Sequence, residues 1–195
     1  MKSLIQSCEA KIEVKKSVFI AHLCEFGEFK ALLSRLKAEH SKARHFVWAF
    51  RRLNELGQVV EDKSDDGEPK GSAGLPCLNV LRGGTLINAA VVVVRYFGGI
   101  KLGTGGLVRA YSGSVNAALD EARQNGFLVG FECKQSVEFT LSLSLYARMQ
   151  HYLNKNKLEF AVNFTPTQAT LCVKVSESEQ KALLNFAQGL EVNFG

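Results

Sequence analysis

A nearly unbroken apolar run, followed at once by a glycine-rich stretch, constrains the fold of this chain most strongly. The run is LINAAVVVVRYF (86–97), and such a run is typical of a central strand buried on both faces. The next nine residues, GGIKLGTGG (98–106), include five glycines, which need a reason because ordering glycine costs conformational entropy. The residues that follow predict a helix that Gly126 stops. Its expected buried stripe is Leu107, Ala110, Tyr111, Ser114, Val115, Ala118, Leu119 and Ala122.

The remaining periodicity predicts a mixed α+β chain of two domains, 1–130 and 131–195. In the first part we expect strands at 15–26 and 45–52, a hairpin partner at 59–63, and helices at 27–41 and 75–84. In the second part we expect strands at 133–143, 158–164 and 169–175, helices at 144–156 and 176–190, and a last short strand at 191–195. This β-α-β-β-α-β order is that of a ferredoxin-like domain, and Ser176 and Glu179 are in capping-box register.

The excess of positive charge lies entirely in the first two-thirds of the chain. The net charge is +5; residues 1–130 hold 18 Lys and Arg against 13 Asp and Glu, whereas residues 131–195 hold 6 of each. Within the first part, residues 40–54 carry four Lys and Arg and no acid. This asymmetry favours an anionic partner, nucleic acid first, and the alternative is a solvated basic face.

Composition argues against several classes of protein. No apolar run approaches the length of a membrane span, and the charged start does not fit a signal peptide. The five cysteines are scattered, without the spacing of a zinc site or a disulfide framework. We therefore expect a reduced, cytoplasmic protein without a metal, a cofactor or a membrane partner. The oligomeric state is not predicted.

The glycine stretch stands between a strand and a helix start, where α/β proteins bind anions through free N–H groups and the helix dipole. It matches neither the Walker A motif nor the dinucleotide fingerprint. The alternative is that its glycines only permit positive φ and close helix–sheet packing. The candidate anion-binding or nucleic-acid-binding residues are Arg95, Gly98, Gly99, Lys101, Gly103, Thr104, Gly105, Gly106 and Arg109, with Lys42, Arg44, His45, Arg51 and Arg52 of the basic stretch.

A second candidate loop is SDDGEPKGSAGLP (64–76), the most loop-like stretch of the chain. Its acidic residues invite a metal interpretation, but they do not follow the alternating pattern of an EF-hand. Adjacent aspartates in a turn are more often solvated or capping side chains. The loop can equally contact an anion beside the glycine stretch. The sequence shows no pairing of a nucleophile with a base that would indicate catalysis. Its candidate residues are Ser64, Asp65, Asp66, Gly67, Glu68, Gly71 and Ser72.

Three blocks, in this order and spacing, carry a resemblance to a known family. They are HSKARHFVWAFR (40–51), SDDGEPKGSAGLP (64–76) and VVVVRYFGGIKLGTGGLVRAY (91–111). The chain resembles the IMPACT family in its bacterial YigZ branch, strongly over about its first 130 residues. The resemblance implies that the N-terminal domain is similar to the second domain of ribosomal protein S five, with helices on one side of its sheet. It implies a ferredoxin-like C-terminal domain similar to the last domain of elongation factor G.

Two classes of function follow. The resemblance and the charge distribution favour a non-catalytic protein that binds RNA or the ribosome and influences translation. The extra partner-binding domain of the eukaryotic relatives does not fit in a chain of this length, so their kinase-pathway role is not carried over. The alternative is an enzyme acting on a nucleotide or phosphorylated small molecule at the glycine stretch, with Asp65, Asp66 and Glu68 as the candidate Mg²⁺ ligands. The resemblance supplies no catalytic residues.

Overall fold

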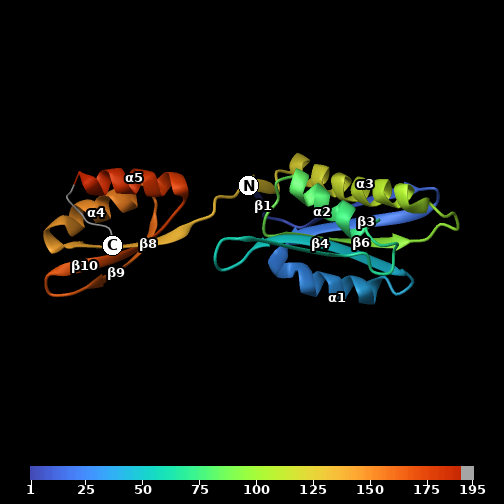
Figure 1. Ribbon diagram of the computed structural model, residues 1–195, viewed down its shortest axis with the longest axis horizontal. Helices are drawn as coiled ribbons and strands as arrows, with labels where there is room; N and C mark the ends of the chain where they lie inside the picture. The colour runs from blue at the N-terminus through green and yellow to red at the C-terminus, as the bar shows by residue number, and fades with distance from the viewer. Residues whose placement is uncertain (190–195) are drawn as a thin grey trace. The chain divides into compact units, whose positions relative to one another are not determined.

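The computed structural model describes residues 1–189, and the chain divides into two compact units, Met1–Phe131 and Glu132–Gly195. Both units are mixed α/β structures (Figure 1). Each unit has its own hydrophobic core, built from helices that pack against an antiparallel sheet.

The first unit is organised around a five-stranded antiparallel sheet in the order β2-β3-β6-β4-β5. The central strand β6 is buried from its first residue to Arg95, which confirms the prediction from the apolar run. The predicted hairpin is also present, since β4 pairs with β5. The strands are β2 (Cys8–Val14), β3 (Ser17–Glu25), β4 (His45–Leu53), β5 (Val59–Ser64) and β6 (Ala89–Tyr96).

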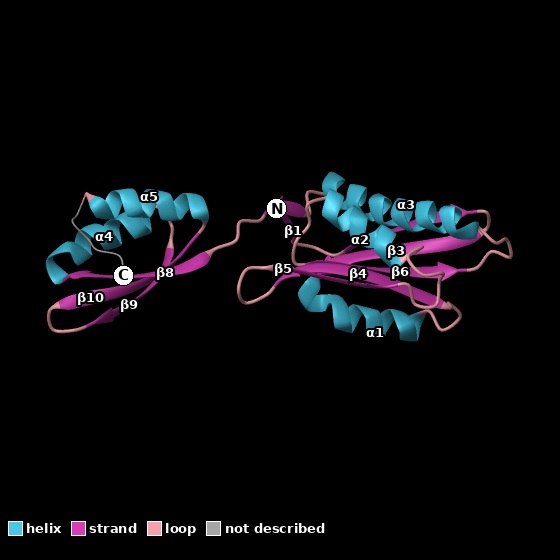
Figure 2. Cartoon of the chain, viewed as in Figure 1, coloured by secondary structure: helices cyan, strands magenta, loops and turns pink. Residues whose placement is uncertain are grey.

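Helices cover both faces of this sheet (Figure 2). The helices α2 (Gly74–Gly83) and α3 (Gly103–Gln124) lie on one face, while α1 (Phe29–Glu39), preceded by the 3-10 turn Phe26–Glu28, lies on the other. The expectation of helices on one side is therefore wrong. Successive side chains of a strand point to opposite faces, and both faces of β6 are apolar. Ala89, Val91 and Val93 enter the core under α2 and α3, and Ala90, Val92 and Val94 enter the core over α1.

The helix after the glycine stretch buries the eight stripe residues predicted from its spacing. It begins at Gly103, so the last three glycines of the stretch belong to its first turn. Gly126 follows the helix with a φ of +70°, which glycine adopts without strain and which confirms its stopping role. A short strand β7 (Leu128–Gly130) then pairs with β1 (Lys2–Leu4).

The second unit runs β-α-β-β-α through its described residues. Its three-stranded antiparallel sheet has the order β8-β10-β9. The predicted capping box is present at the last helix, where Ser176 and Glu179 exchange side-chain and backbone hydrogen bonds. The strand expected at 191–195 lies outside the described residues. The elements are β8 (Gln135–Ser142), α4 (Leu143–Lys155), β9 (Glu159–Phe164), β10 (Gln168–Val175) and α5 (Glu177–Gln188).

Candidate functional site

The glycines between β6 and α3 serve two structural purposes. Gly98 packs against the turn between β2 and β3 so closely that a Cβ would overlap the carbonyl group of Lys16. Its N–H donates to Ser17 Oγ at 3.1 Å. Gly99 and Gly103 have φ values of +84° and +70°, a region that side chains rarely adopt. Packing and backbone conformation therefore account for three of the five glycines.

The N-terminus of α3 is free of side-chain caps. Its N-cap residue is Leu102, which makes no side-chain capping hydrogen bond. Lys101 precedes this turn, and the guanidinium of Arg109 reaches back to it, since a Cβ on Gly105 would lie 3.8 Å from Arg109 Nη1. Within residues 1–189 neither cation has an ion-pair partner. The arrangement leaves amide donors, the positive end of the helix dipole and two cations available to an anion.

Asp65 organises the second loop from within. Its carboxylate accepts hydrogen bonds from the N–H groups of Gly71 at 2.8 Å, Ala73 at 3.1 Å and Gly74 at 2.8 Å. Because Gly74 begins α2, this carboxylate also satisfies donors at that helix start. Burial acts to raise the pKa of Asp65, but the three N–H bonds together outweigh it and the pKa is lowered.

The lowered pKa predicts a pH-dependent contribution to stability. An ordinary Asp titrates near pH ~3.9, so the Asp65 contribution is complete above that pH and is lost as pH falls through the lower folded-state value. We expect Asp65→Asn to lower the free energy of unfolding by about 2 kcal/mol at pH 7. Urea unfolding at pH 7 and near pH 3 checks this: the gap between variant and parent should narrow at the acid end. An equal difference in free energy of unfolding at both pH values would contradict the lowered pKa of Asp65.

The rest of the second loop is fastened to β4. The Asp66 carboxylate accepts from the N–H of Phe46 at 2.6 Å, and His45 Nδ1 lies 2.8 Å from the Asp66 carbonyl oxygen. Gly67 adopts a φ of +85° beside the His45 ring, and Ser72 donates its hydroxyl to the carbonyl of Pro69. The two aspartates therefore bind backbone N–H groups, as the turn interpretation predicts. No group of three metal-ligating side chains occurs in residues 1–189.

A buried ion pair joins the second loop to the end of β6. Arg95 Nη1 donates to Glu68 Oε1, and the two side chains are 6% and 4% exposed. The hydroxyl of Tyr111, from α3, donates to the same oxygen at 2.7 Å. Burial first, and then the bond to Glu68, raise the pKa of Tyr111 well above its usual range, so it stays a neutral donor. The charge of Arg95 is thus balanced by Glu68.

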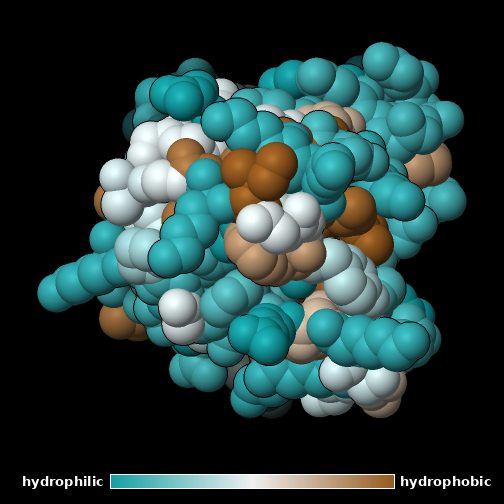
Figure 3. All heavy atoms as spheres, turned by 90° about the vertical axis from the view of Figure 1, so that its right-hand side faces the viewer, coloured by the Kyte–Doolittle hydropathy of each residue, from teal (hydrophilic) through white to brown (hydrophobic). Residues whose placement is uncertain are grey.

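The two predicted loops meet around a hollow of about 370 Å³ above this ion pair. One side comes from the second loop and the other from the glycine stretch and the first turn of α3. Phe97, one of the lining residues, is 55% exposed. Figure 3 looks onto this end of the first unit and shows apolar side chains gathered among hydrophilic ones. The lining residues are Glu68, Pro69, Arg95, Phe97, Lys101, Leu102, Gly103, Thr104 and Leu107.

The basic stretch does not form one patch. His45 pairs with Arg95 in the sheet, at the end that carries the glycine stretch, whereas Arg51 pairs with Ala89 at the other end. Six residues of strand separate the two positions by about 20 Å. Lys42 and Arg44 precede β4, so they belong to the end with the hollow.

The arginines at the far end have partners of their own. Arg51 donates to Glu61 at 2.6 Å and to the carbonyl of Leu86 at 2.9 Å. Arg52 lies over the ring of Phe26, with its guanidinium carbon 5.4 Å from the ring centre. These two residues are therefore separated from the candidate site by the length of β4 and are engaged within the fold.

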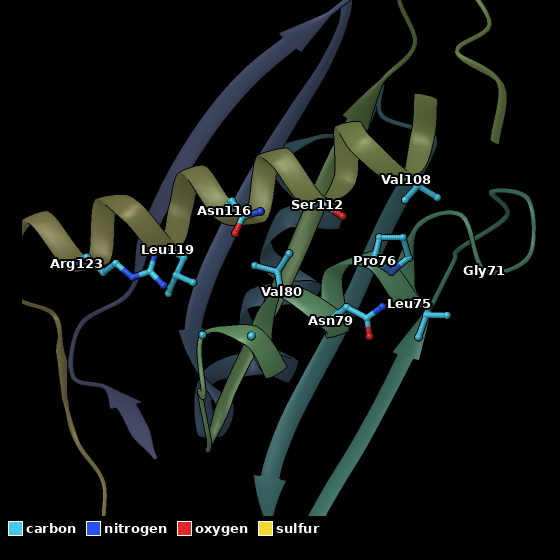
Figure 4. A pocket seen from close by; sticks show the side chains of 12 residues that line it. Gly71, Leu75, Pro76, Asn79, Val80, Val108, Ser112, Asn116, Leu119 and Arg123 are labelled. Carbon is cyan, nitrogen blue, oxygen red and sulfur yellow. The ribbon is translucent and has the colours of Figure 1, made fainter. Parts of the chain in front are cut away.

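A second depression runs between α2 and α3 (Figure 4) and measures about 570 Å³. Leu75 and Val80 of α2 face Val108 and Leu119 of α3 across it. Asn79, Asn116 and Arg123 supply polar groups along the same depression. Of the candidate binding residues named from the sequence, Gly71 alone is among the described residues that line this depression.

Sequence reasoning missed Phe97 and Tyr111 as members of the site, although it placed Tyr111 in the buried stripe of the helix. The signal for Phe97 was its position directly after a buried strand and before the glycines, where a large aromatic ring has no core left to enter. No signal in the sequence pairs Tyr111 with Glu68, which lies 43 positions away.

The comparisons with known proteins bear on the whole of this unit. A family model, the Impact N-terminal domain, matches residues 15–119, which is more than half of the chain. The chain belongs to the IMPACT family. This identification confirms the resemblance carried by the three sequence blocks, and all three lie within the matched region. Among described residues, no helix is long and apolar enough to span a bilayer.

Individual members of the IMPACT family extend the match. IMPACT family member YigZ of Escherichia coli is 47% identical over 112 residues, which cover 55% of this chain and 54% of that protein. A family member of Thermus thermophilus is 31% identical over 182 residues, covering 90% of this chain and 96% of that protein. A crystal structure described as a hypothetical protein superposes with a TM-score of 0.65 at 28% identity, covering 98% of this chain and 94% of that one. The match to YigZ thus spans about half of that relative's length.

Proposed function

We propose that this chain is a non-catalytic cytoplasmic protein that binds RNA, free or within the ribosome, through its first unit and influences translation. The observation that carries the proposal is the uncapped N-terminus of α3 with Lys101 and Arg109 beside it, both without an ion-pair partner among residues 1–189. A phosphate group needs this combination of amide donors and mobile cations. Membership of the IMPACT family, whose eukaryotic relatives act on translation, supports the same direction.

The charge of the unit supports an electrostatic contact. The excess of positive charge lies in the first 130 residues. Two exposed arginines, Arg82 and Arg123, are neutralised by ion pairs, and the half-buried Arg52 packs on the Phe26 ring. Lys42 and Arg44 join Lys101 and Arg109 at one end of the sheet as cations without an ion-pair partner among the described residues. Phosphate contacts through such side chains release counterions, so affinity falls steeply as salt rises.

Co-sedimentation with ribosomes over a salt series tests the proposal. We expect Lys101→Ala/Arg109→Ala to weaken binding and to lower the slope of log affinity against log salt by about one unit per lost phosphate contact. The matched control is Lys30→Ala/Lys37→Ala, which removes the same charge from exposed positions on α1. If both double variants weaken binding equally, binding depends on net charge alone. The absence of any binding at low salt would overturn the proposal.

A further inference from the structure

We propose that the hollow beside α3 binds one unpaired nucleotide, with its base stacked on Phe97 and the base edge directed at Arg95 and Glu68. This inference rests on the RNA-binding function proposed above and specifies what the site holds. It adds a base-binding pocket to the phosphate contacts and predicts that the protein distinguishes single-stranded from double-stranded RNA.

Phe97 has the position of a stacking platform. Its side chain is 55% exposed although it directly follows the buried strand β6. The Arg95 guanidinium carbon lies 5.8 Å from its ring centre, so one side of the ring is in contact with a cation. Exposed aromatic rings on which bases stack are the common device of proteins that bind single-stranded nucleic acid.

The floor of the hollow holds polar groups that the described protein leaves unsatisfied. Arg95 is only 6% exposed, and its Nε is buried without a hydrogen-bond partner. Leaving a buried donor unpaired is costly, so a ligand that supplies an acceptor there is favoured. Within residues 1–189, the two hydrogen bonds that Glu68 accepts both reach Oε1, and no group donates to Oε2. Arg95 and Glu68 both line the hollow, so its floor carries a donor and an acceptor, and the edge of a base carries both.

The rim of the hollow provides the phosphate contacts. Lys101, Gly103 and Thr104 line it, and Gly103 begins the uncapped helix. A nucleotide with its base on Phe97 would therefore direct its phosphate toward amide donors and a cation. The hollow combines an apolar wall, a polar floor and a cationic rim. These suit the face of a base, the edge of a base and a phosphate group, respectively.

The size of the hollow favours an unpaired nucleotide. Its volume of about 370 Å³ falls within the range of small-ligand sites, about 300–1,000 Å³. A base inside a duplex keeps its faces stacked and its edge paired, so it cannot enter. Loops, bulges and free ends can place a base in such a site. A free mononucleotide carries the same chemistry, and the experiment separates these two sources.

The test measures binding of labelled oligo(U), the oligo(U)·oligo(A) duplex, and unlabelled UMP and AMP to the full chain at low salt. We expect Phe97→Leu to weaken oligo(U) binding about tenfold or more, as loss of one base–aromatic stack does, and to leave duplex binding unchanged. Phe97→Tyr keeps the ring and should bind like the parent. Phe164→Leu, at an equally exposed phenylalanine of the second unit, is the matched control.

The outcomes separate this inference from the proposed function. Unchanged oligo(U) binding in Phe97→Leu, with loss in Lys101→Ala/Arg109→Ala, would overturn the nucleotide pocket and leave the phosphate contacts standing. Binding of UMP or AMP that needs Phe97, without any oligo(U) binding, would support the pocket and overturn RNA as its source. Absence of binding to every probe would overturn both. If the thermal unfolding curve of Phe97→Leu matches that of the parent, a loss of oligo(U) binding in this variant is due to the pocket and not to lower stability.

Discussion

Replacing Glu68 by alanine is expected to lower the free energy of unfolding of the first unit by about 3–5 kcal/mol. The substitution leaves the Arg95 guanidinium buried at 6% exposure without its only ion-pair partner among the described residues. It also removes the acceptor of the Tyr111 hydroxyl, which is itself fully buried. Breaking one side of a buried pair costs far more than the pair contributes, because the remaining charge stays out of water.

Fluorescence of Trp48 during urea unfolding measures this effect, since Trp48 is the single tryptophan and lies in β4 of the first unit. Asp120→Ala is the control, because it breaks an ion pair with Arg123 whose side chains are about half exposed. Exposed pairs contribute less than about 1 kcal/mol. Glu68→Leu/Arg95→Leu removes both charges and should recover most of the loss. Equal small losses in Glu68→Ala and Asp120→Ala would contradict the structural role of the buried pair.

Replacing Gly98 by alanine is expected to lower the free energy of unfolding of the first unit. The loss should exceed the cost of about 1–3 kcal/mol that is usual for an overpacked site. The added Cβ would overlap the Lys16 carbonyl and the Ser17 amide, both of which are backbone groups of the β2–β3 turn. A flexible side chain can move aside, but a backbone turn held by two paired strands moves only with its sheet. The loop must therefore separate from the turn, and the bond from Gly98 N–H to Ser17 Oγ breaks.

Gly105→Ala is the matched control for Gly98→Ala. A Cβ at Gly105 would meet only the end of the Arg109 side chain at 3.8 Å, and its place in the first turn of α3 favours alanine over glycine by about 0.5–1 kcal/mol. Unfolding followed at Trp48 should show a large loss for Gly98→Ala and no loss, or a small gain, for Gly105→Ala. Two variants of equal stability would show that the loop does not depend on its contact with the turn.

Several elements of the fold follow from local patterns in the sequence. The apolar run predicts β6, the eight-residue stripe predicts the buried face of α3, and Ser176 with Glu179 predicts the start of α5. The strand β2 was missed although CEAKIEV alternates in burial along its whole length. Its charged residues conceal a narrow apolar face, and its role as an edge strand depends on β3, which it pairs with.

The layer arrangement also had a local signal. Alanine and valine fill every position of β6 from 89 to 94, and a strand apolar on both faces requires cover on both. The resemblance implied helices on one side, and the burial of β6 between two cores corrects it. The periodicity of this one strand was the better guide.

Hydrophobic period is set by residues a few positions apart, so local patterns predict most of the helices and strands and the faces that they bury. Only the tertiary structure decided the chemistry of the site. It pairs Arg95 with Glu68, separated by 27 positions, and leaves Lys101 and Arg109, at the start of α3, without an ion-pair partner in the part of the chain that the structure describes. Charge and spacing do not distinguish a cation held by a buried carboxylate from a free one. That distinction depends on strand register and on where two distant loops meet, which no local pattern records.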